Sequence, residues 1–431
     1  MVRFSDMRAP RQIVGSTNAE RLNRGCFCVT LDRLALADAF DREVGAEGFA
    51  GALERSHPLL FSNVPVFVPA SALAEMTQVV AAVEAAAALP GYREAALGWA
   101  NPMARRDLGP VGALMGYDFH LAADGPKLIE INTNAGGAFL NAPLARAQRA
   151  CCAPIEFRAS NAGDFAAEIA GMFRAEWSRQ RRSGRLERIA ILDDTPQAQY
   201  LLPEFQLAQA LLRAQGIDTL IGDPTDLVRD GDGVLLAGQR IDLVYNRLVD
   251  FAFEDPAHAT LRAAYLDDRV VVTPNPHVYA VLADKRSLSL LSNHEQMRAW
   301  GLAASHLGVL QASALTTVMV TSDNAEALWQ GRRDWFFKPA RGHASKAAYR
   351  GDKLTRRVWG EIMAGDYVAQ SYAAPSLRHV RHDGVPAELK VDVRLYVYDG
   401  KVLLTAARLY RGQTTNMRTP GGGFAPVLIA P

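Results

Sequence analysis

The segment LIEINTNAGG, residues 128–137, places one carboxylate and two amides at alternate positions of a strand and ends in a pair of glycines. Alternate residues of a strand face the same side, so Glu130, Asn132 and Asn134 share one face and present the oxygen ligands that Mg²⁺ accepts. The glycines allow the backbone to approach a ligand closely. A polar face turned to solvent explains the glutamate but not the whole set, and we therefore interpret the segment as a ligand-binding strand.

The residues before this strand predict a helix followed by a β-hairpin. Residues 71–89 form an alanine-rich run of high helix propensity that ends before a proline. Two runs with strand character follow, at residues 114–121 and 126–132, and the dipeptide Asp124-Gly125 between them is typical of a tight turn. The polar strand is therefore expected to be the second strand of a hairpin.

From residue 188 the pattern changes to an alternation of strands and helices. The strand runs RIAILDD, IDTLIGD, RIDLVYNRL and DRVVVTPNP predict an α/β domain with a mostly parallel sheet over residues 188–280. Ligands of such sheets collect at the carboxyl ends of the strands, and this rule points to Asp193, Asp194, Arg247 and Asn275.

The last part of the chain contains a second α/β section. Lys338 ends a hydrophobic strand before a glycine-containing loop, where its charge could meet a phosphate; an ordinary strand-end lysine is the alternative. Asp392 and Arg394 share one face of a later strand, where an acid can hold a cation and a guanidinium can bind a carboxylate or phosphate; a surface salt bridge is the alternative. The chain has no Walker motif, G-x-S-x-G elbow or kinase signature set.

Composition limits the partners that are expected. The 47 basic and 46 acidic residues give a formal net charge of +1, so no global field attracts nucleic acid or an anionic membrane. The basic run RQRRSGRLER is interpreted as a solvated helix end or linker. Four cysteines are too few for a disulfide framework and are interpreted as buried small side chains. The most apolar helical run, residues 79–89, is too short to span a membrane, and a soluble cytoplasmic protein is expected.

Together these motifs resemble the ATP-grasp superfamily of ATP-dependent carboxylate-amine and carboxylate-thiol ligases. ADKRSLSLL, with Lys285, resembles the helix that carries the first nucleotide-binding lysine, and FFKPARGHASK, with Lys338, resembles the strand that carries the second. YVAQSY is similar to the hinge strand, and this resemblance implies that Gln370, Ser371 and Tyr372 line the adenine.

The other motifs of the superfamily have counterparts as well. VDVRLYV resembles the acid-bearing strand, which implies that Asp392 is a metal ligand and that Arg394 contacts the acyl phosphate or substrate. TNMRTPGGG resembles the loop that follows, with Asn416 at the nucleotide. The hairpin MGYDFHLAADGPKLIEINTNAGG resembles the last motif, which implies that Glu130 and Asn132 are metal ligands.

This last motif stands early in the chain, whereas the sequence stops at GGGFAPVLIAP, where the motif would be expected. The order is similar to that of circularly permuted members such as eukaryotic-type glutathione synthetase and the glutathionylspermidine synthetase-like ligases. Permutation is tolerable because domain termini tend to lie close together at the surface. The expected fold is an α/β, circularly permuted ATP-grasp with a Rossmann-like pre-ATP-grasp domain. Its expected parts are an N-terminal extension (1–64), the permuted C-terminal part of the ATP-grasp domain (65–150), a helical linker (151–187), the pre-ATP-grasp α/β substrate domain (188–280) and the ATP-grasp domain (281–431).

The resemblance implies an ATP-dependent ligase that activates a carboxylate as an acyl phosphate and joins it to an amine or a thiol in an amide-like bond. It implies ATP and Mg²⁺ as cofactors, with Mn²⁺ as an alternative ion. Arg247, Asn275 and Asn134 are expected to face the small-molecule substrates; no nucleic acid or membrane partner is expected, and a homodimer is left open. Two other functions stay open: a nucleotide-binding module without ligase activity, which the lack of an acid in SYAAPSLRHV after the hinge would suit, and a small-molecule kinase.

Overall fold

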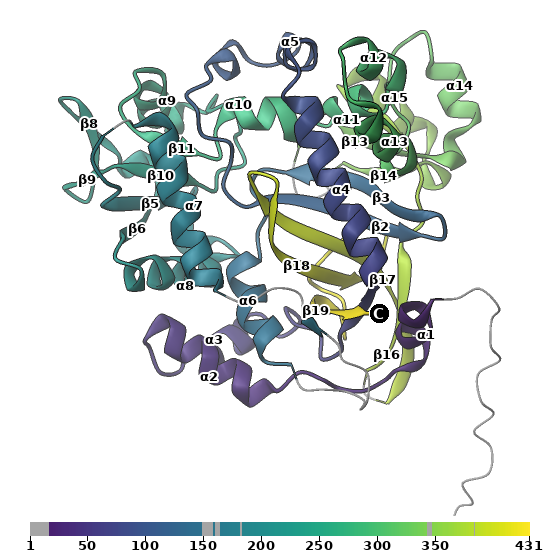
Figure 1. The fold of residues 1–431 in the computed structure, drawn as a ribbon, viewed down its shortest axis with the longest axis horizontal. Helices are drawn as coiled ribbons and strands as arrows, with labels where there is room; N and C mark the ends of the chain where they lie inside the picture. Colours follow the sequence, from purple (N-terminus) through teal and green to yellow (C-terminus); the bar gives the residue numbers. More distant parts are fainter. Residues whose placement is uncertain (1–16, 149–157, 160–163, 182, 343–346, 383) are drawn as a thin grey trace, which may run out of the picture.

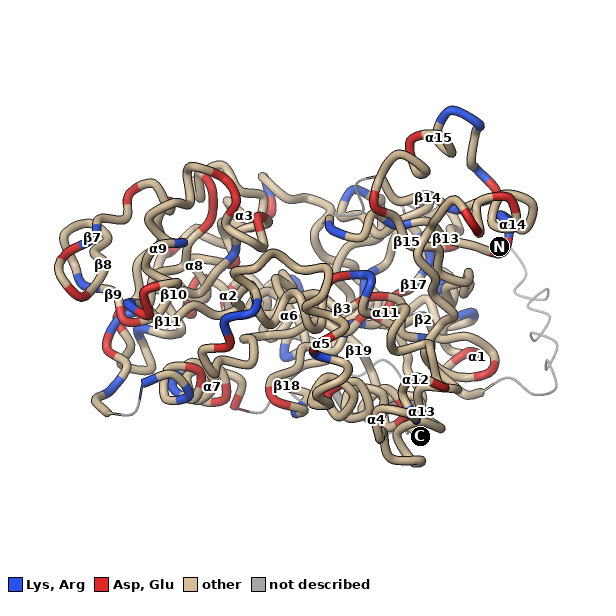
Figure 2. Tube along the Cα trace, turned by 90° about the horizontal axis from the view of Figure 1, so that it is seen from above, with Lys and Arg blue, Asp and Glu red and all other residues tan. Residues whose placement is uncertain are grey.

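The structure is a computed structural model that describes residues 17–148, 158–159, 164–181, 183–342, 347–382 and 384–431 (Figure 1). A parallel sheet lies at one end of the molecule, a small antiparallel sheet lies at the other, and the strands of a large mixed sheet lie between them. Figure 2 shows the same order from above.

The large sheet joins segments that are far apart in the sequence. Its strand order is β1-β19-β18-β17-β2-β3, with β16 also paired to β17 and β4 to β19. β2 and β3 form the predicted hairpin, which is confirmed, and β2 is antiparallel to β17 with Asp118 opposite Arg394. The strands are β1 (Val66–Pro69), β2 (Met115–Ala122), β3 (Gly125–Asn132), β4 (Arg158–Ala159), β16 (Ser376–His382), β17 (Val385–Tyr398), β18 (Lys401–Tyr410) and β19 (Gly423–Ala430).

Alternation along the hairpin separates an apolar face from a polar face. The apolar face packs against α4 (Ala70–Ala87) and α13 (Ala304–Ser313). The β2–β3 pairing skips Ile129, and this β-bulge lets Leu128 and Ile131, three positions apart, enter the same core. Glu130 therefore stays opposite Asp118 on the polar face.

The alanine-rich run forms α4 within two residues of its predicted bounds, and α5 (Pro90–Gly98) follows. α4 is buried through Met76, Val79 and Val83, which pack on the sheet. Among the helices that the structure describes, no single one is long and apolar enough to cross a membrane. α4 and α5 meet the requirement for length and composition only together, as a pair bent by 80°.

The parallel sheet predicted from residue 188 onward is confirmed, with the order β11-β10-β5-β6. Alternate residues of its central strands enter two different cores, one under α7 and α8 and one under α9. In chain order, β5 is followed by its neighbour β6, and β10 is followed by its neighbour β11 on the other side of the sheet. The connections from β5 and β10 therefore run in opposite directions and open a crevice at the carboxyl ends of these two strands. The elements are β5 (Arg188–Leu192), β6 (Asp218–Gly222), β10 (Leu243–Asn246), β11 (Val271–Thr273), α7 (Phe165–Gln180), α8 (Leu202–Ala214) and α9 (Ala259–Leu266), beside a ribbon of β7 (Val228–Asp230), β8 (Gly233–Leu236) and β9 (Gln239–Ile241).

The small antiparallel sheet has the order β12-β15-β13-β14 and its own core of Trp329, Phe337 and Trp359. It consists of β12 (Thr317–Met319), β13 (Trp335–Pro339), β14 (Tyr349–Arg350) and β15 (Tyr367–Ser371), with α14 (Ala325–Gln330) and α15 (Arg356–Ala364). The chain reaches this sheet through α10 (Pro276–Val278), a π-helical turn at Tyr279–Ala283, α11 (Ser287–Leu291) and α12 (His294–Ala299). Lys285 lies just before α11 rather than inside a helix, which corrects the expected lysine-bearing helix.

The described part of the N-terminal segment folds as α1 (Asn18–Gly25), α2 (Arg33–Val44) and α3 (Phe49–Ser56). The Asn23 amide of α1 donates to the Phe67 carbonyl and accepts from the Phe67 amide, so α1 covers the edge strand β1. α2 packs against α6 (Ala138–Arg146) and α8. The expectation of buried cysteines holds for Cys26 but is wrong for Cys28, which is exposed; Cys151 and Cys152 lie outside the described residues.

Arg378 of β16 fastens this segment to the sheet. Its fully buried guanidinium donates to the backbone carbonyls of Pro65, Asn23 and His379 at 2.8, 3.0 and 2.7 Å.

We predict that Arg378→Met lowers the free energy of unfolding by about 3 kcal/mol, because buried carbonyls lose charge-assisted donors. Urea unfolding measures this change. The matched control is Arg381→Met, an exposed position on the same strand, and equal midpoints for the two variants would contradict the prediction.

Candidate active site

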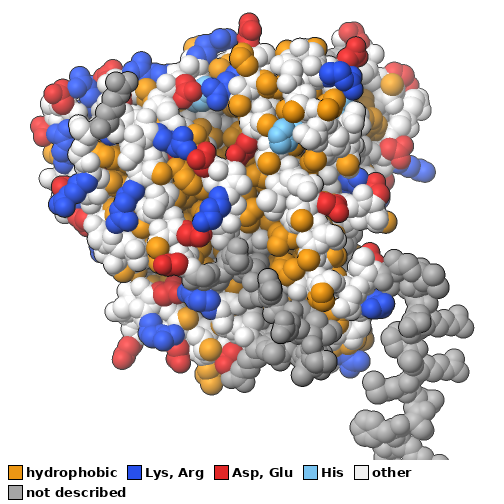
Figure 3. All heavy atoms as spheres, viewed as in Figure 1, with side chains coloured by type: hydrophobic (Ala, Val, Ile, Leu, Met, Phe, Trp, Pro, Cys, Tyr) orange, Lys and Arg blue, Asp and Glu red, His pale blue; other side chains and the backbone are white. Residues whose placement is uncertain are grey.

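A cavity of about 530 Å³ lies where the three sheets meet. Its wall takes Glu130, Asn132 and Arg394 from the large sheet, Lys338 and Gln370 from the small sheet, and Asp193 and Arg247 from the carboxyl ends of β5 and β10. On the surface shown in Figure 3, basic and acidic side chains are intermixed over the parallel-sheet part of the molecule. Lysine and arginine side chains are concentrated in the cavity rather than on this face.

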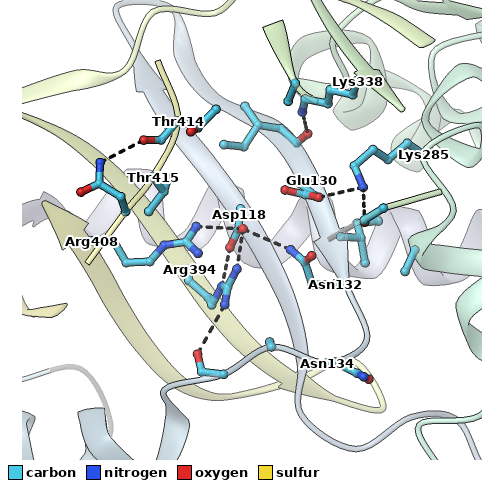
Figure 4. A pocket seen from close by; sticks show the side chains of 18 of the residues that line it. Asp118, Glu130, Asn132, Asn134, Lys285, Lys338, Arg394, Arg408, Thr414 and Thr415 are labelled. Atoms are coloured by element: carbon cyan, nitrogen blue, oxygen red, sulfur yellow. Dashed lines mark hydrogen bonds and ion pairs between the residues drawn. The ribbon is translucent and has the colours of Figure 1, made fainter. Parts of the chain in front are cut away.

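Asp118 is the centre of the polar face (Figure 4). Arg394 of β17 donates to it in bidentate fashion, from Nε to Oδ1 at 2.6 Å and from Nη2 to Oδ2 at 2.7 Å. Arg408 of β18 reaches the same carboxylate at 2.8 Å, and the Asn132 amide donates to it at 3.2 Å. Burial by itself raises the pKa of Asp118, but the two guanidinium groups outweigh burial and hold this pKa well below its usual range. Asp118 is therefore ionised in the folded protein.

Glu130 lies next to Asp118 and faces two lysines. The Lys285 ammonium is 3.1 Å from Oε1 of Glu130 and also donates to the Gly342 carbonyl at 3.0 Å. Burial raises the pKa of Glu130, whereas Lys285 and Lys338 lower it, and the net shift is downward. The two lysines thus meet a carboxylate that is charged at neutral pH.

Lys338 joins the small sheet to the hairpin. Its ammonium donates to the Ile129 carbonyl at 2.7 Å, which is the carbonyl of the bulged residue, and to Oε1 of Gln370 at 2.9 Å. Burial lowers the pKa of Lys338 to about 8, although Glu130 opposes the shift. Because the lysine needs an acceptor, Gln370 must turn its oxygen toward Nζ, and its Nε2 is left buried without a partner among the described residues.

The hinge side of the cavity continues from Gln370 into Ser371 and Tyr372. The guanidinium of Arg350 lies 4.3 Å from the centre of the Tyr372 ring and holds β14 against the hinge. The His120 ring bonds the Ala373 carbonyl at 2.8 Å, which ties β2 to the same segment. This end of the cavity combines the Tyr372 ring and the apolar side chains of Leu315, Phe336 and Pro375 with the polar side chains of Gln370 and Ser371.

The opposite end of the cavity is formed by the parallel sheet. Arg247 is buried, with its guanidinium 5.2 Å from the Tyr245 ring centre and donating to the Tyr245 hydroxyl at 3.1 Å. Asp193 lies on the same wall, and burial, partly offset by Arg247, raises the pKa of Asp193 to about 6. Asn134 donates to the Leu248 carbonyl and leaves its oxygen buried without a partner in the described part of the chain. A cation, an anion and a free amide oxygen thus meet at this end.

The glycine pair that ends the polar strand has a packing role as well. Gly137 has φ +103°, a left-handed conformation, and a Cβ there would lie 2.3 Å from the Phe424 ring. A Cβ on Gly136 would lie 2.5 Å from Leu201. The Glu204 carboxylate accepts from the Gly137 amide at 2.6 Å and so occupies the start of α6.

The structure brings most of the predicted residues to this cavity. Those on its wall are Glu130, Asn132, Asn134, Arg247, Lys285, Lys338, Gln370, Ser371, Tyr372, Arg394 and Asn416. Asn416 also holds its own loop, since its amide donates to the Arg411 carbonyl at 2.7 Å.

Three predicted residues are placed elsewhere. Asp194 does not line the cavity, and its carboxylate bonds the His258 ring at 2.7 Å. Asp392 is fully buried behind the cavity wall, and its carboxylate accepts hydrogen bonds from Arg408 and from the Thr415 hydroxyl. It lies at the point where the strand paired with β17 changes from β16 to β2. Asn275, expected at the substrate, caps α10 by accepting from the Val278 amide at 2.9 Å and does not line the cavity. The carboxylate that accompanies Glu130 and Asn132 is Asp118.

Asp118 and Arg408 were not singled out from the sequence. Asp118 stands in GYDF, the first strand of the hairpin, and its spacing of twelve residues from Glu130 is the signal that could have found it. Arg408 stands in an otherwise apolar strand, TAARLYRG, where one buried guanidinium needs an anionic partner.

The donor set fits a hard divalent cation. The carboxylate of Glu130 and the amide oxygen of Asn132 are ligand types that Mg²⁺ takes, and both residues line one wall. Asp118, whose oxygens accept from Arg394, Arg408 and Asn132, adds a negative charge beside them. Within the described residues no group of three or more His, Cys, Asp and Glu side chains forms a metal cluster, so the amide oxygen is an essential part of this set. One carboxylate and one amide oxygen leave further coordination positions for water, as Mg²⁺ sites usually do.

A cavity lined by cations lies between a small sheet, a carboxylate-bearing hairpin and a parallel-sheet domain, which is the arrangement expected of an ATP-grasp-type fold. A glutathione synthetase-like effector of Globodera pallida in its apo form matches at 14% sequence identity over 93% of this chain and 98% of that chain, with a TM-score of 0.55. The chain therefore shares its ATP-grasp-type fold with this glutathione synthetase-like protein, and its early hairpin β2–β3 pairs with the late strand β17.

Two other solved structures are similar. A protein provisionally named a gamma-glutamylcysteine synthetase, from Methylobacillus flagellatus KT, matches at 11% identity over 84% of this chain and 89% of that chain, with a TM-score of 0.49. The ATP-grasp ligase PsnB with its minimal precursor matches at 16% identity over 57% and 78%, with a TM-score of 0.33. No family model and no curated protein matches the sequence. Likeness at these identities establishes the fold and not the activity.

The Asp118 cluster makes a pH-dependent prediction. Asp118→Asn leaves two buried guanidinium groups without their shared anion and should lower the free energy of unfolding by about 3–5 kcal/mol at pH 7. Because the pKa of Asp118 is depressed in the folded protein, this contribution is present above about pH 4 and is lost as the pH falls further. Unfolding measured from pH 7 to pH 2 should show the difference from wild type shrinking in acid. Asp124→Asn, exposed in the turn of the same hairpin, is the control, and a difference that is constant down to pH 2 would contradict the assignment.

Proposed function

We propose that this protein is an ATP-dependent ligase that activates a carboxylate as an acyl phosphate and transfers the acyl group to an amine or a thiol. The observation that carries this proposal is one continuous cavity with three kinds of wall: a flat hinge, a cluster of cations with oxygen donors, and a charged pocket at the parallel sheet. Those walls suit, in that order, a nucleobase, a polyphosphate with its metal ion, and a small polar substrate.

Lys285 and Lys338 are the residues that would meet the phosphates. Both are buried, and in this structure their ammonium groups lie on Glu130 and on backbone carbonyls. A polyphosphate would offer them stronger partners, and Glu130 would then be free to bind a cation. Glu130 and Asn132 would hold Mg²⁺ beside the negative charge of Asp118, and the ion would supply positive charge to the phosphate oxygens.

Arg394 and Arg247 are the residues that would orient the acyl group and its substrate. The Nε and Nη2 atoms of Arg394 donate to Asp118, and its Nη1 makes only a long hydrogen bond of 3.4 Å to the Gly136 carbonyl. Nη1 is therefore the nitrogen that can donate to a phosphate oxygen. Arg247 can bind a carboxylate and Asp193 an ammonium group, and both lie at one end of the cavity. We therefore propose an amino-acid-like molecule, with both charges, as the first substrate.

The reaction class is tested by supplying Mg²⁺ and ATP with a panel of amino acids and dipeptides in the presence of hydroxylamine. A ligase that forms an acyl phosphate gives ADP, phosphate and a hydroxamate, because hydroxylamine captures the acyl group. ADP with a stable phosphorylated product would favour a kinase. Nucleotide binding with no ADP from any member of the panel would favour a binding module.

The metal assignment makes a separate prediction. Glu130→Gln should reduce ADP formation by at least about a thousandfold, because the lost carboxylate both binds the ion and sets the charge of the phosphate site. Steady-state ADP release measures the rate, and an unchanged thermal unfolding midpoint shows that the fold is kept. The matched control is Glu47→Gln, an exposed position outside the cavity, and wild-type rates in Glu130→Gln would remove Glu130 from the metal site.

Lys338 predicts the pH dependence of nucleotide binding. Its pKa of about 8 means that the amine loses its charge as the pH rises through this value, and an anion binds the charged form better. The affinity for Mg²⁺ and AMP-PNP should therefore fall from pH 7 to pH 9.5, by up to about tenfold per pH unit above the pKa. Calorimetric titration at several pH values measures this slope. Lys338→Met should bind weakly at every pH without the slope, and a flat profile in wild type would contradict the role of Lys338.

A further inference from the structure

Two loops form the end of the cavity that lies at the parallel sheet. The β5 loop, residues 193–201, follows β5 and lines the cavity with Asp193, and the β10 loop, residues 247–254, follows β10 and lines it with Arg247. Backbone pairing between the two strands ends where the Arg247 amide donates to the Leu192 carbonyl at 2.9 Å. Beyond this point, only side chains can hold the two loops together.

His258 joins the two loops. It ends the short helix η4 (Pro256–His258), and its side chain is almost fully buried. Its Nε2 lies 2.7 Å from Oδ1 of Asp194 in the β5 loop, and its Nδ1 lies 2.7 Å from Oδ2 of Asp250 in the β10 loop. No other hydrogen bond or ion pair joins the two loops in the part of the chain that the structure describes. We call this arrangement of Asp194, His258 and Asp250 the His258 bridge.

The two hydrogen bonds fix the protonation state of His258. An ionised carboxylate can only accept hydrogen bonds, so a ring nitrogen that is bonded to it must carry a proton. Both ring nitrogens have such a partner, and His258 is therefore an imidazolium. Burial lowers the pKa of His258, but the hydrogen bonds and charges of Asp194 and Asp250 outweigh burial and raise this pKa. Burial raises the pKa of Asp250, but the Asp255 and Glu254 amides and His258 outweigh burial, so Asp250 is ionised.

Further charged groups lie on the elements around the bridge. The short helix η3 (Pro224–Asp226) and α9 both pack against η4. Asp223, which caps η3, acts on His258 at longer range, and its carboxylate accepts from the Thr195 and Thr225 amides at 2.7 and 2.9 Å. The remaining charged groups on these three helices and their caps are Asp226 of η3, Asp255 at the start of η4 and Arg262 of α9. Carboxylates outnumber guanidinium groups here, and these surroundings favour the imidazolium.

Loss of one proton from this imidazolium breaks the bridge. The ring then keeps one N–H, and the lone pair of the other nitrogen faces a carboxylate oxygen at 2.7 Å, which is a repulsive contact. Asp250 keeps the Asp255 amide as a second donor at 2.8 Å, whereas the Asp194 side chain is half-exposed and can turn to water. The β5 loop is therefore the loop that is released.

We propose that His258 is a positioning residue of the substrate end of the cavity: as an imidazolium it holds the β5 loop against the β10 loop, and when it loses a proton it releases the β5 loop. The Asp194 amide donates to Oδ1 of Asp193 at 2.9 Å, so release of Asp194 also moves Asp193, the carboxylate assigned to the substrate ammonium group. Arg247, assigned to the substrate carboxylate, lies on the loop that stays. The bridge therefore sets the spacing of the two groups. Only this role in the substrate pocket rests on the proposed function; the bridge and its proton do not.

The test measures amide hydrogen exchange of the full chain at pH 6.5, 7.5 and 9, with each rate divided by the intrinsic rate at that pH. The bridge is complete below the ordinary pKa of histidine, about 6.5, and is lost as the pH rises through the raised value. Protection of the β5 loop should therefore fall at least about tenfold between pH 6.5 and pH 9, while protection of strands β5 and β10 stays constant. His258→Gln, which is neutral at every pH, should show the low protection throughout. His306→Gln on α13 is the matched control and should keep the wild-type profile.

Asp194→Asn distinguishes a bridge that depends on a proton from one that is only structural. The asparagine side chain can accept from an imidazole N–H or donate to a bare ring nitrogen, so it bonds His258 in either protonation state. Protection of the β5 loop should then be independent of pH, and the half-exposed position of Asp194 leaves the core intact. A flat profile in wild type, or a fall in Asp194→Asn equal to that of wild type, would overturn the proposal.

Hydroxamate formation is measured on the same proteins at pH 7 with the panel of amino acids and dipeptides. His258→Gln should raise the KM of the carboxylate substrate by at least about fivefold and change kcat and the KM for ATP by less than about twofold, because the bridge positions substrate groups and not the lysines. An unchanged KM would overturn the positioning role. Hydroxamate formation with pH-independent protection of the β5 loop disproves the bridge alone. The described exchange profile without any hydroxamate supports the bridge and disproves the ligase reaction.

Discussion

The structure depends on one buried carboxylate. Asp118 accepts hydrogen bonds from Arg394, which lies 276 positions later in the sequence, and Arg408 bridges from Asp118 to Asp392 on the strand between them. Each of these charges would be costly in the interior by itself, and they are stable because they are taken out of water together. The same buried ion pairs therefore hold the early hairpin to the late strands and set the charge of the cavity.

Under the proposed function, the same charge balance prepares the cavity for a polyphosphate. The ammonium groups of Lys285 and Lys338 lie against Glu130 and backbone carbonyls, so each of these two buried charges has a partner. A phosphate group is negatively charged and a divalent cation is positively charged. The proposed function requires only that the two lysines turn to the phosphate and that the protein oxygen ligands turn to the cation. The site can thus be ordered before its ligands arrive, and ordering costs less on binding.

Local patterns predicted much of this architecture. Period-two alternation placed the hairpin and the late strands, helix propensity placed α4, and the rule for parallel sheets brought Asp193 and Arg247 to one cavity wall. The wrong site predictions concern which residues become neighbours in the folded chain. Asp392 follows the alternation expected of a residue on the cavity wall, yet it lies just beyond the part of β17 that pairs with β2. Asn275 stands after a strand as expected, but its side chain caps a helix.

The sequence by itself determined which segments form strands and helices and which side chains can share a face, because these properties follow from neighbours within a few residues. Only the tertiary structure decided that Asp118, rather than Asp392, accompanies Glu130 and Asn132. This choice depends on the register of β2 against β17 and on the bulge at Ile129, which buries Leu128 beside Ile131 and turns a carbonyl toward Lys338. Register is set by the packing of a whole sheet against its core, and no single segment contains that information.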